Sequence, residues 1–403
     1  MSDIGKLKIL QVHNYYQIPG GEDTVVANEK RLLEDHGHTV IQYSRNNGEL
    51  KQFSKIRKLL LPFTTIFNPS TYREIKRIIR EQQIDVVHVH NTLNLVSPAV
   101  YYAALSCKVP VVQTIHNFRL LCPGATFYRD GHICEECVQK GLRCSVKYGC
   151  YRGSKIQTLV CALSTWIHRM TGVYGKLNYI CLTEFNKEKL LGLKQIKFDR
   201  VFVKPNFVST KLDKIVPMQE REDRFIFAGR IDKLKGVDIL LEAWKLMGEE
   251  APKLIICGTG PMEAWCKDYI QKNNLSSVDM LGFVPNEEAK KLIANSRALI
   301  LPTQWYEGFP MTIVEAYSVG TPVVGSNMGN VGSVIHAGIT GEVFQPNNST
   351  DLMNKIIKCS ETNSYLIDEM TQSYGSERNY QIMKNIYLEV IENNQGGGYS
   401  LSL

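Results

Sequence analysis

The chain has 403 residues, of which 44% are hydrophobic and 22% charged, so it is long enough for two or three ordinary globular domains. No apolar run is long enough to cross a bilayer, and the N-terminus does not follow the plan of a secretory signal peptide, so we expect a cytoplasmic protein. The formal net charge of +7 combines a net +13 in residues 1–205 with a net −6 in the remainder, so anionic partners are expected at the first half.

Short β-like runs alternate with helical segments along the whole chain. In the first half these runs are KILQV, VIQYS, DVVHVH, VPVVQTIH, YICLT and VFVKPN, and in the second half RFIFAGR, LIICGTG, VDMLGFV, ALILPT and TPVVGS. This alternation predicts parallel sheets that are covered by helices on both faces. Two such series predict two doubly wound α/β domains, which we place at 1–205 and 206–392, followed by a flexible tail at 393–403.

The most basic segment of the first half is KQFSKIRKLLLPFTTIF at 51–67. Its cations Lys55, Arg57 and Lys58 stand beside Leu, Ile and Phe, a mixture that suits the surface of an anionic membrane. The same composition also fits the solvated face of an ordinary helix, and the sequence leaves both interpretations open.

Polar residues follow several predicted strands, at the carboxyl ends where doubly wound sheets bind ligands. Gly20 and Gly21 lie between the first strand and a helix, where a backbone can approach a phosphate at the helix N-terminus. A plain turn explains two glycines equally well, and they do not form the GxGxxG fingerprint of dinucleotide enzymes. His116 ends the strand VVQTI of the same half.

In the second half, the loop GRIDKLKG leaves a strand and enters a helix at Gly236. Its two cations Arg230 and Lys235 can neutralise a diphosphate without a metal ion. A solvated basic loop is the alternative interpretation.

Two glutamates eight residues apart, Glu307 and Glu315, follow the apolar strand RALILPT in the stretch QWYEGFPMTIVEA. Pro310 suits the first turn of a helix, so we expect a helix that starts at Phe309 or Pro310. The N–H groups around Gly308 would then face a ligand, and the carboxylates could accept hydrogen bonds from sugar and ribose hydroxyls. Alternatively, the first carboxylate caps the helix and the second is a satisfied buried acid.

These pieces together resemble a retaining glycosyltransferase of the GT-B fold, in glycosyltransferase family 4. The resemblance spans nearly the whole chain and rests on PGGEDTVVANEKRLLEDHGHTV, DVVHVHN, VVQTIHN, FAGRIDKLKGVDILLEAW, LIICGTGP, LGFVPNEEAKKLIANSRALILPTQWYEGFPMTIVEAYSVGTPVVGSNMGNVGSVI and GITGEVF. It implies two Rossmann-like domains facing across a cleft, the first for the acceptor and the second for a sugar nucleotide, with a C-terminal helix that crosses back to the first.

The resemblance also implies roles for single residues. Glu307 would contact the donor sugar and take part in catalysis together with His116, which would lie beside the reacting sugar. Glu315 would bind the ribose, and Arg230 and Lys235 the diphosphate.

In the same way, the resemblance places Gly20 and Gly21 near the phosphates and the acceptor, and Gly308, Phe309 and Pro310 at the donor. The chain contains no Asp-x-Asp, the motif by which another glycosyltransferase fold holds a divalent metal, so no catalytic metal is expected. UDP-sugars are favoured over GDP-sugars as co-substrate.

An insert at 119–154 departs from the commonest family pattern. It contains Cys122, Cys134, Cys137, Cys144 and Cys150, of which Cys134 and Cys137 have the spacing of a zinc knuckle. The possible ligands of a structural zinc are Cys134, Cys137, Cys144 and Cys150. Eleven cysteines cannot all pair within the chain, and in a reducing compartment they are thiols or metal ligands. Structural zinc, free thiols and a loop disulfide all remain open for this insert.

The sequence therefore predicts a sugar-nucleotide-dependent retaining glycosyltransferase. Its acceptor would be a saccharide, in the leading interpretation lipid-linked, met at the inner face of the cell membrane during cell-surface polysaccharide synthesis. A sugar-nucleotide 2-epimerase on the same fold would need acid–base groups beside C2, which the sequence does not reveal. A zinc-bearing nucleic-acid-binding protein would leave both glutamates without a role, so no nucleic-acid partner is expected.

Overall fold

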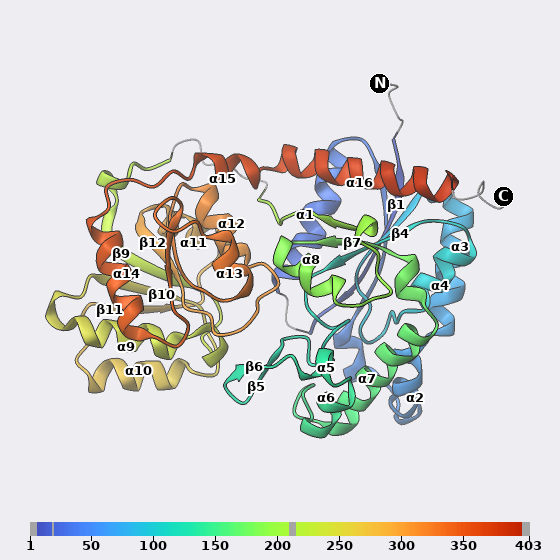
Figure 1. Cartoon of the computed structure of the whole chain (residues 1–403), viewed down its shortest axis with the longest axis horizontal. Coiled ribbons are helices and arrows are strands. Elements are labelled where there is room, and N and C mark those ends of the chain that lie inside the picture. The colour runs from blue at the N-terminus through green and yellow to red at the C-terminus, as the bar shows by residue number, and fades with distance from the viewer. Residues whose placement is uncertain (1–5, 18–19, 209–214, 397–403) are drawn as a thin grey trace. The chain divides into compact units, whose positions relative to one another are not determined.

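The computed structural model describes residues 6–17, 20–208 and 215–396 (Figure 1). The chain divides into two compact units. Unit one comprises residues 1–129, 134–205 and 379–403, and unit two comprises 130–133 and 206–378. Each unit is built around its own parallel six-stranded sheet.

The sheet of unit one has the strand order β2-β1-β3-β4-β7-β8. Its strands are β1 (Lys8–Tyr15), β2 (Thr39–Asn46), β3 (Val86–Asn91), β4 (Val111–Ile115), β7 (Asn178–Cys181) and β8 (Val201–Val203). The helices of this unit are α1 (Gly21–Asp35), α2 (Lys55–Ile66), α3 (Pro69–Gln82), α4 (Ala99–Ser106), α7 (Lys155–Met170) and α8 (Glu184–Leu191). The insert contributes β5 (Tyr128–Arg129), β6 (His132–Ile133), α5 (Glu136–Gln139) and α6 (Arg143–Tyr148).

The sheet of unit two has the strand order β11-β10-β9-β12-β13-β14. Its strands are β9 (Glu222–Ala228), β10 (Lys253–Cys257), β11 (Val278–Gly282), β12 (Ser296–Leu301), β13 (Val323–Ser326) and β14 (Gly341–Phe344). Its helices are α9 (Val237–Met247), α10 (Glu263–Lys272), α11 (Asn286–Ala294), α12 (Met311–Ser318), α13 (Gly329–Val334), α14 (Ser349–Glu361) and α15 (Asp368–Ser373). Two doubly wound α/β sheets were predicted from the alternation of strands and helices, and this prediction is confirmed.

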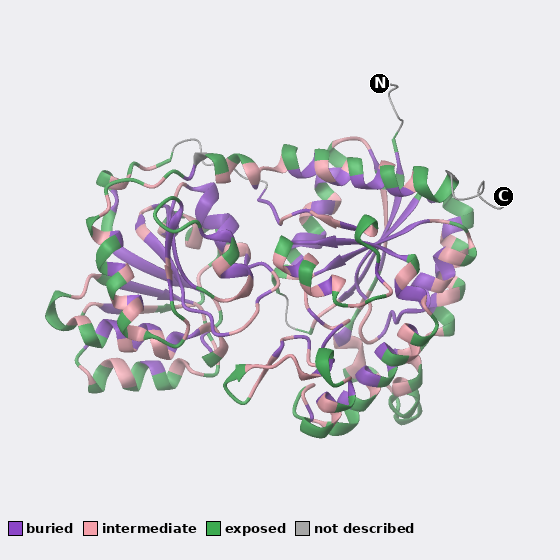
Figure 2. Ribbon diagram, in the orientation of Figure 1, coloured by how far each residue is buried: buried purple, intermediate pink, exposed green. Residues whose placement is uncertain are grey.

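The inner strands are short and rich in Val, Ile and Leu because helices cover both of their faces. Strands β3 and β4 are buried along their whole length. Figure 2 shows the strands of both sheets buried and the helices exposed on their outer sides. Apolar side chains therefore occupy the sheet interiors, and the polar groups of interest lie where the strands end.

The last helix, α16 (Ser376–Gly396), starts with three residues of unit two and continues along unit one. Its Tyr380 hydroxyl lies 2.9 Å from His38 Nε2, and its Tyr387 hydroxyl lies 2.7 Å from His88 Nδ1. The expected return of the C-terminal helix to the N-terminal domain is thus confirmed. Residues 393–396, which the sequence assigned to the tail, are helical, and 397–403 lie outside the described residues.

No helix in the described part of the chain is long and apolar enough to cross a membrane.

Candidate active site

In unit two, the strand order reverses between β9 and β12. Doubly wound sheets bind their ligands beyond the carboxyl ends of the strands at such a reversal. Strand β9 leads directly into Gly229 and Arg230, and β12 leads into the loop that contains Glu307. The two loops singled out by the sequence therefore leave the same edge of one sheet, on neighbouring strands.

Lys235 and Glu307 form an ion pair across these loops. The Nζ atom of Lys235 lies 2.7 Å from Oε2 of Glu307, whose side chain is only 7% exposed. The other carboxylate oxygen, Oε1, is buried without a hydrogen-bond partner. A buried acceptor that lacks a donor is costly, so this oxygen suits the hydroxyl group of a ligand. The sequence assigned these two residues to different parts of a donor, and in the structure they bind each other.

Gly236 allows the basic loop to approach the neighbouring strand. Its φ of +71° lies in the left-handed region, and a Cβ atom there would meet the carbonyl oxygen of Pro302 at 1.8 Å. Only glycine fits both conditions. The glycine thus fixes the close packing of the Lys235 loop against the end of β12, from which the loop of Glu307 departs.

Arg230 is held beside the same loop but keeps its guanidinium accessible. Its Nε atom lies 2.5 Å from Oδ2 of Asp232, and the Arg230 side chain is 67% exposed. The other oxygen of Asp232 accepts a hydrogen bond from the backbone N–H of Lys235 at 3.0 Å. A single aspartate therefore orients one cation and shapes the turn that carries the other.

The loop before α12 is anchored through its carbonyl oxygens. The Asn330 side chain donates to the carbonyl oxygens of Glu307 and Gly308, and Asn206 Nδ2 donates to that of Phe309 at 3.2 Å. The first N–H groups of a helix have no acceptor within the helix. Helix α12 begins at Met311, so the expected start at Phe309 or Pro310 was too early. Pro310 is the extended residue just before the helix, with a ψ of 123°.

Glu315 lies inside α12 and is buried. Its Oε1 accepts a hydrogen bond of 2.8 Å from Asn286 Nδ2, at the start of α11. This partner is a neutral amide, so the carboxylate keeps its charge uncompensated by this contact and remains a suitable acceptor for ligand hydroxyls.

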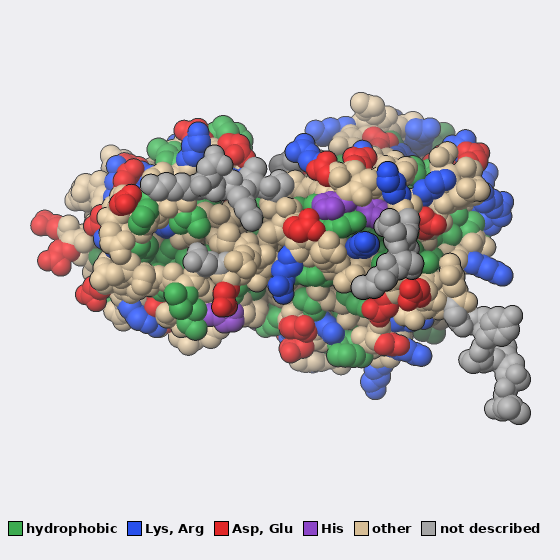
Figure 3. All heavy atoms as spheres, turned by 90° about the horizontal axis from the view of Figure 1, so that it is seen from above, with side chains coloured by type: hydrophobic (Ala, Val, Ile, Leu, Met, Phe, Trp, Pro, Cys, Tyr) green, Lys and Arg blue, Asp and Glu red, His purple; other side chains and the backbone are tan. Residues whose placement is uncertain are grey.

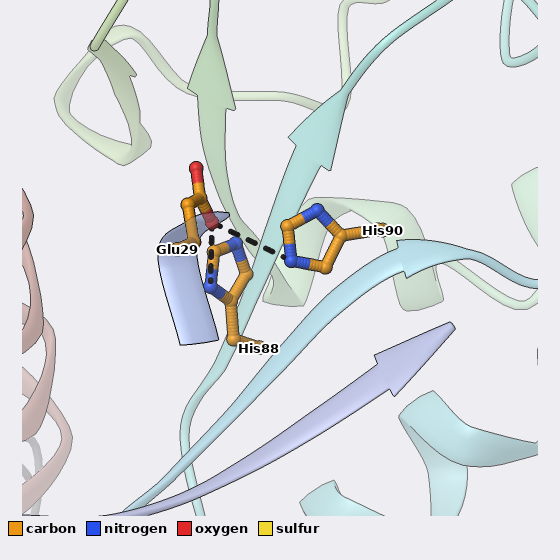
Figure 4. A group of neighbouring side chains, drawn as sticks. All are labelled: Glu29, His88 and His90. Carbon is orange, nitrogen blue, oxygen red and sulfur yellow. Dashed lines mark ion pairs between the residues drawn. The ribbon is translucent and has the colours of Figure 1, made fainter. Parts of the chain in front are cut away.

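In unit one, the strand order reverses between β1 and β3, and a cluster of histidines lies near this reversal. His116 follows β4, and its Nε2 atom lies 3.0 Å from Nδ1 of His90 on β3. The two rings stack with centroids 5.3 Å apart. Behind them, Nε2 of His90 lies 3.5 Å from Oε2 of Glu29, a residue of α1. Figure 4 shows contacts from this carboxylate to both His88 and His90.

Glu29 is fully buried and is neutralised by Lys204, whose Nζ atom lies 2.7 Å from Oε1 of Glu29. Among the described residues, Glu29, His88 and His90 are the group whose ligand atoms all lie within 4.8 Å of one another, a spacing that a metal ion could use. An ammonium already compensates this carboxylate, and a second cation beside it would be repelled. We therefore interpret the group as a buried polar network, built on the Lys204–Glu29 ion pair, that supports His116.

Burial keeps these histidines neutral. It lowers the pKa of His116 and of His90 well below the usual range, and neighbouring histidines add to the effect. Burial also lowers the pKa of His88 to about 4, although Glu29 opposes this shift. At neutral pH, His116 is thus an uncharged hydrogen-bonding group.

The predicted glycine loop connects to the same cluster. The N–H of Gly20 donates to Oδ2 of Asp23 at 2.9 Å, and Oδ1 of Asp23 lies 2.8 Å from Nε2 of His13. The His13 and His90 rings lie 6.1 Å apart. No protein atom lies within 4 Å of the position that a Cβ of Gly20 would take, so packing within the chain does not require glycine there. This open backbone suits the approach of a ligand.

Glu22, next to this loop, is an unusual carboxyl group. Burial raises its pKa to about 8 and outweighs the hydrogen bond of 2.9 Å that Tyr16 donates to it. A protonated carboxyl at neutral pH can donate as well as accept a hydrogen bond. The polar end of β1 thus offers a ligand mainly uncharged groups.

The cysteine insert forms a third cluster, in unit one. A small cavity of about 10 Å³, the size of one water molecule or ion, is lined by the five thiols of the insert, namely Cys122, Cys134, Cys137, Cys144 and Cys150. A hydrogen bond with Cys137 lowers the pKa of Cys122 to about 6. None of the eleven cysteines of the chain is in a disulfide. The four predicted ligands do surround one cavity, but no three of their sulfur atoms lie as close together as the ligand atoms of the Glu29 group.

Several residues of these clusters were not predicted. Asp232 stands in the sequence between the two cations of GRIDKLKG, and this local charge pattern could have identified it. Glu29 and Lys204 are separated by 175 residues, and no local pattern connects them. Asn330 was likewise missed, because a lone asparagine carries no signature. Cys122 was recognised as part of the insert but was not counted among the predicted ligands, since it precedes the knuckle by twelve positions.

Comparison with known families gives two matches that together extend from residue 19 to residue 377. The model "Glycosyltransferase Family 4" matches residues 19–212, and the model "Glycosyl transferases group 1" matches residues 208–377. The first of these segments contains the histidine cluster and the second contains the Lys235–Glu307 pair.

Individual relatives are distant. An uncharacterised glycosyltransferase of Methanocaldococcus jannaschii is 26% identical over 369 residues, which cover 87% of this chain and 88% of that protein. An uncharacterised 41.2 kDa protein of the cps region of Klebsiella pneumoniae is 23% identical and covers 82% of this chain and 84% of its own. The structure of Anabaena HepE in complex with UDP and glucose is similar in fold, with a TM-score of 0.63 at 17% identity over 94% of this chain and 99% of that one.

The buried histidines predict a loss of stability in acid. Their pKa values are lower in the folded than in the unfolded protein, so unfolding takes up protons and stability falls as the pH drops from about 6.5 towards 4. Calorimetric melting of the protein at pH 7, 6 and 5 should show a falling Tm. In His88→Asn the Tm should be lower at pH 7 but should depend less on pH, whereas removal of the exposed His132 should leave the slope unchanged. A Tm that rises in acid would contradict this assignment.

Proposed function

Because the chain belongs to glycosyltransferase family 4, a family of retaining enzymes that use nucleotide-sugar donors, we propose specific roles for the two clusters in such a transfer. Unit two would bind the donor at the β9–β12 reversal. Unit one would bind the acceptor at the β1–β3 reversal. The observation that carries this proposal is the Lys235–Glu307 pair, which joins a cation for a diphosphate to a carboxylate for sugar hydroxyls.

The donor would be bound without a metal ion. Arg230 is exposed and oriented by Asp232, and Lys235 lies on the same loop, so both cations can meet the two phosphates. The first N–H groups of α12 add a partial positive charge. Glu307 would accept hydrogen bonds from the sugar, and Glu315 from the ribose. The UDP and glucose bound by the similar HepE structure support a UDP-sugar rather than a GDP-sugar.

Unit one would supply a neutral hydrogen-bonding surface beside the reacting sugar. His116, uncharged at neutral pH and fixed by His90, would contact the sugar without repelling the developing positive charge at the anomeric carbon. The open backbone at Gly20, together with Gly21 at the start of α1, would approach the phosphates and the acceptor.

The transfer would proceed on one face of the sugar. The bond from the anomeric carbon to the leaving phosphate oxygen breaks, and the acceptor hydroxyl bonds to the same face, which retains the configuration. The proton of that hydroxyl moves to the leaving phosphate. Arg230, Lys235 and the α12 amides would stabilise the charge that develops on the diphosphate.

The acceptor would be a lipid-linked saccharide, reached by a cytoplasmic enzyme at the inner face of the cell membrane. The match to a protein of the Klebsiella cps region favours a role in cell-surface polysaccharide synthesis. The net +13 of residues 1–205 favours an anionic acceptor.

Donor binding can be tested by thermal shift with UDP-, GDP- and TDP-sugars. A donor at 100 times its Kd should stabilise the protein by about 2.7 kcal/mol.

Arg230→Ala and Lys235→Ala should each reduce the stabilisation of the transition state by about 2–4 kcal/mol, measured from kcat/KM, as loss of one electrostatic donor does elsewhere. EDTA should leave turnover unchanged. Full activity of both variants, or a strict need for Mg²⁺, would refute the metal-free diphosphate site.

Substitution of the two glutamates should affect different kinetic constants. Glu307→Gln keeps the shape but removes the charge that pairs with Lys235, and kcat should fall about 10²- to 10³-fold. Glu315→Gln can still accept the hydrogen bond from Asn286, so its fold should survive and its main effect should be a higher KM for the donor. Steady-state kinetics of both variants, with melting curves as control, separate these effects. Two unstable variants with normal activity per folded molecule would make both residues structural.

The cysteine insert would hold a structural zinc. Its thiols surround one cavity and could close on an ion by small movements, with bonds of about 2.3 Å. Elemental analysis should find about one zinc per chain. Cys134→Ser should lower this content, whereas Cys107→Ser, outside the insert, should not. Comparing Cys122→Ser with Cys144→Ser tells which of the two completes the site. A metal-free, fully active preparation would end the zinc hypothesis and leave the transferase assignment intact.

A further inference from the structure

Helices α2 and α7 of unit one pack against each other (Figure 1), and many of their residues are exposed (Figure 2). Several of these exposed residues are apolar. A helical stripe of apolar residues normally faces the core. Here the stripes face solvent, at Ile56, Leu59, Leu60 and Phe63 on α2 and at Ile156, Leu159, Leu163, Trp166 and Met170 on α7. Ile56, Leu59, Phe63, Ile156 and Met170 are each at least 70% exposed. A contiguous apolar surface of this kind marks an interaction site.

The same surface contains no carboxylate. The segments that form it, residues 50–73 and 137–183, include no Asp or Glu but twelve Lys and Arg. Lys55, Arg57 and Lys58 on α2, and Arg152 and Lys155 at the start of α7, are exposed beside the apolar stripes. We call this combined face the α2–α7 surface. Elsewhere the charges are mixed, and Figure 3 shows Lys and Arg interspersed with Asp and Glu on the face of unit one that carries α16.

The two helices are held rigidly enough to present this surface. His168 of α7 is buried, and its Nε2 atom lies 2.9 Å from the carbonyl oxygen of Ile66 at the end of α2. Its other ring nitrogen lies 2.8 Å from the Tyr102 hydroxyl. The apolar stripes therefore lie on helices that are fixed to the rest of unit one by hydrogen bonds.

A cavity of about 300 Å³ lies at the α2–α7 surface, with apolar walls that include Leu61 and Val160 and with Lys58 and Arg152 at its rim. Thr65 and Cys161 line this cavity and also the smaller cavity that contains His116. These two side chains thus belong to the walls of both cavities, the one at the α2–α7 surface and the one at the predicted acceptor site.

We propose that the α2–α7 surface docks on an anionic lipid bilayer and so delivers the membrane-bound acceptor to the cavity that leads to His116. The proposal rests on the proposed function in one respect, that the acceptor is membrane-bound. The choice of an anionic bilayer as the partner rests on the α2–α7 surface itself. Apolar side chains would enter the interfacial region, while the flanking Lys and Arg would contact anionic headgroups. A second copy of the chain would instead bring two basic, acid-free faces together, which is unfavourable.

Vesicle binding by the full chain tests the proposal. The protein should sediment with phosphatidylcholine vesicles that contain phosphatidylglycerol and bind much less to pure phosphatidylcholine, and added salt should weaken the interaction. Trp166 fluorescence should shift to the blue on binding. Lys155→Glu should lower the vesicle partition coefficient about thirtyfold, because one charge reversal changes the local charge by two. The double variant Phe63→Ser and Leu159→Ser should abolish the shift.

Matched variants elsewhere serve as controls. Lys197→Glu reverses an exposed charge of unit one outside the segments that form this surface. Phe283→Ser removes a 77% exposed aromatic side chain of unit two. Both variants should bind vesicles normally. All variants should retain the thermal shift given by a nucleotide-sugar, measured without vesicles, so loss of donor binding would count against the proposed function and not against the surface. Equal binding to neutral vesicles, no vesicle binding, or a concentration-dependent dimer that the Phe63 and Leu159 changes dissolve would overturn the proposal.

Discussion

The buried ion pair between Lys204 and Glu29 is the constraint on which unit one depends. Both side chains are fully buried, and removal of one partner from such a pair typically costs about 3–5 kcal/mol, since it leaves the other charge uncompensated. Lys204 follows β8 and Glu29 belongs to α1, while Asn379 of α16 accepts a hydrogen bond from Lys204 at 3.1 Å. The pair therefore joins the edge of the sheet, its first helix and the returning C-terminal helix beneath the histidines.

The two units solve the placement of polar groups in different ways. Unit one buries the Lys204–Glu29 ion pair below the site. It presents neutral imidazoles there, because burial lowers the pKa of His90 and of His116. Unit two keeps one of its cations accessible, because Arg230 is oriented by Asp232 but exposed. A neutral surface suits a sugar whose anomeric carbon becomes positive, and an accessible cation suits a diphosphate. This contrast agrees with the proposed division, in which unit one binds the acceptor and unit two the donor.

Local patterns predicted the fold and singled out individual candidate residues for the site, but they did not predict the contacts between these residues. Strand periodicity placed both sheets, and the position of Glu307 after an apolar strand identified it as unusual. Its contact with Lys235 joins residues 72 apart, and a contact of that kind is decided by strand order rather than by neighbours in sequence. For α7, helical periodicity alone would indicate a face buried in the core. In the structure this apolar stripe is exposed to solvent. Only the lack of any acidic residue around it distinguishes this stripe in the sequence.

The contact between Lys235 and Glu307 also affects selectivity. In the structure each group neutralises the other, and the Glu307 side chain is only 7% exposed. If Lys235 turns to a diphosphate as proposed, the carboxylate is left behind and needs the hydroxyls of the sugar. A ligand that offers only a phosphate, or only a sugar, separates the pair and compensates one half of it. An intact nucleotide-sugar would compensate both groups at once. Under the proposed roles, the pair would therefore disfavour fragments and hydrolysed donors relative to the intact donor.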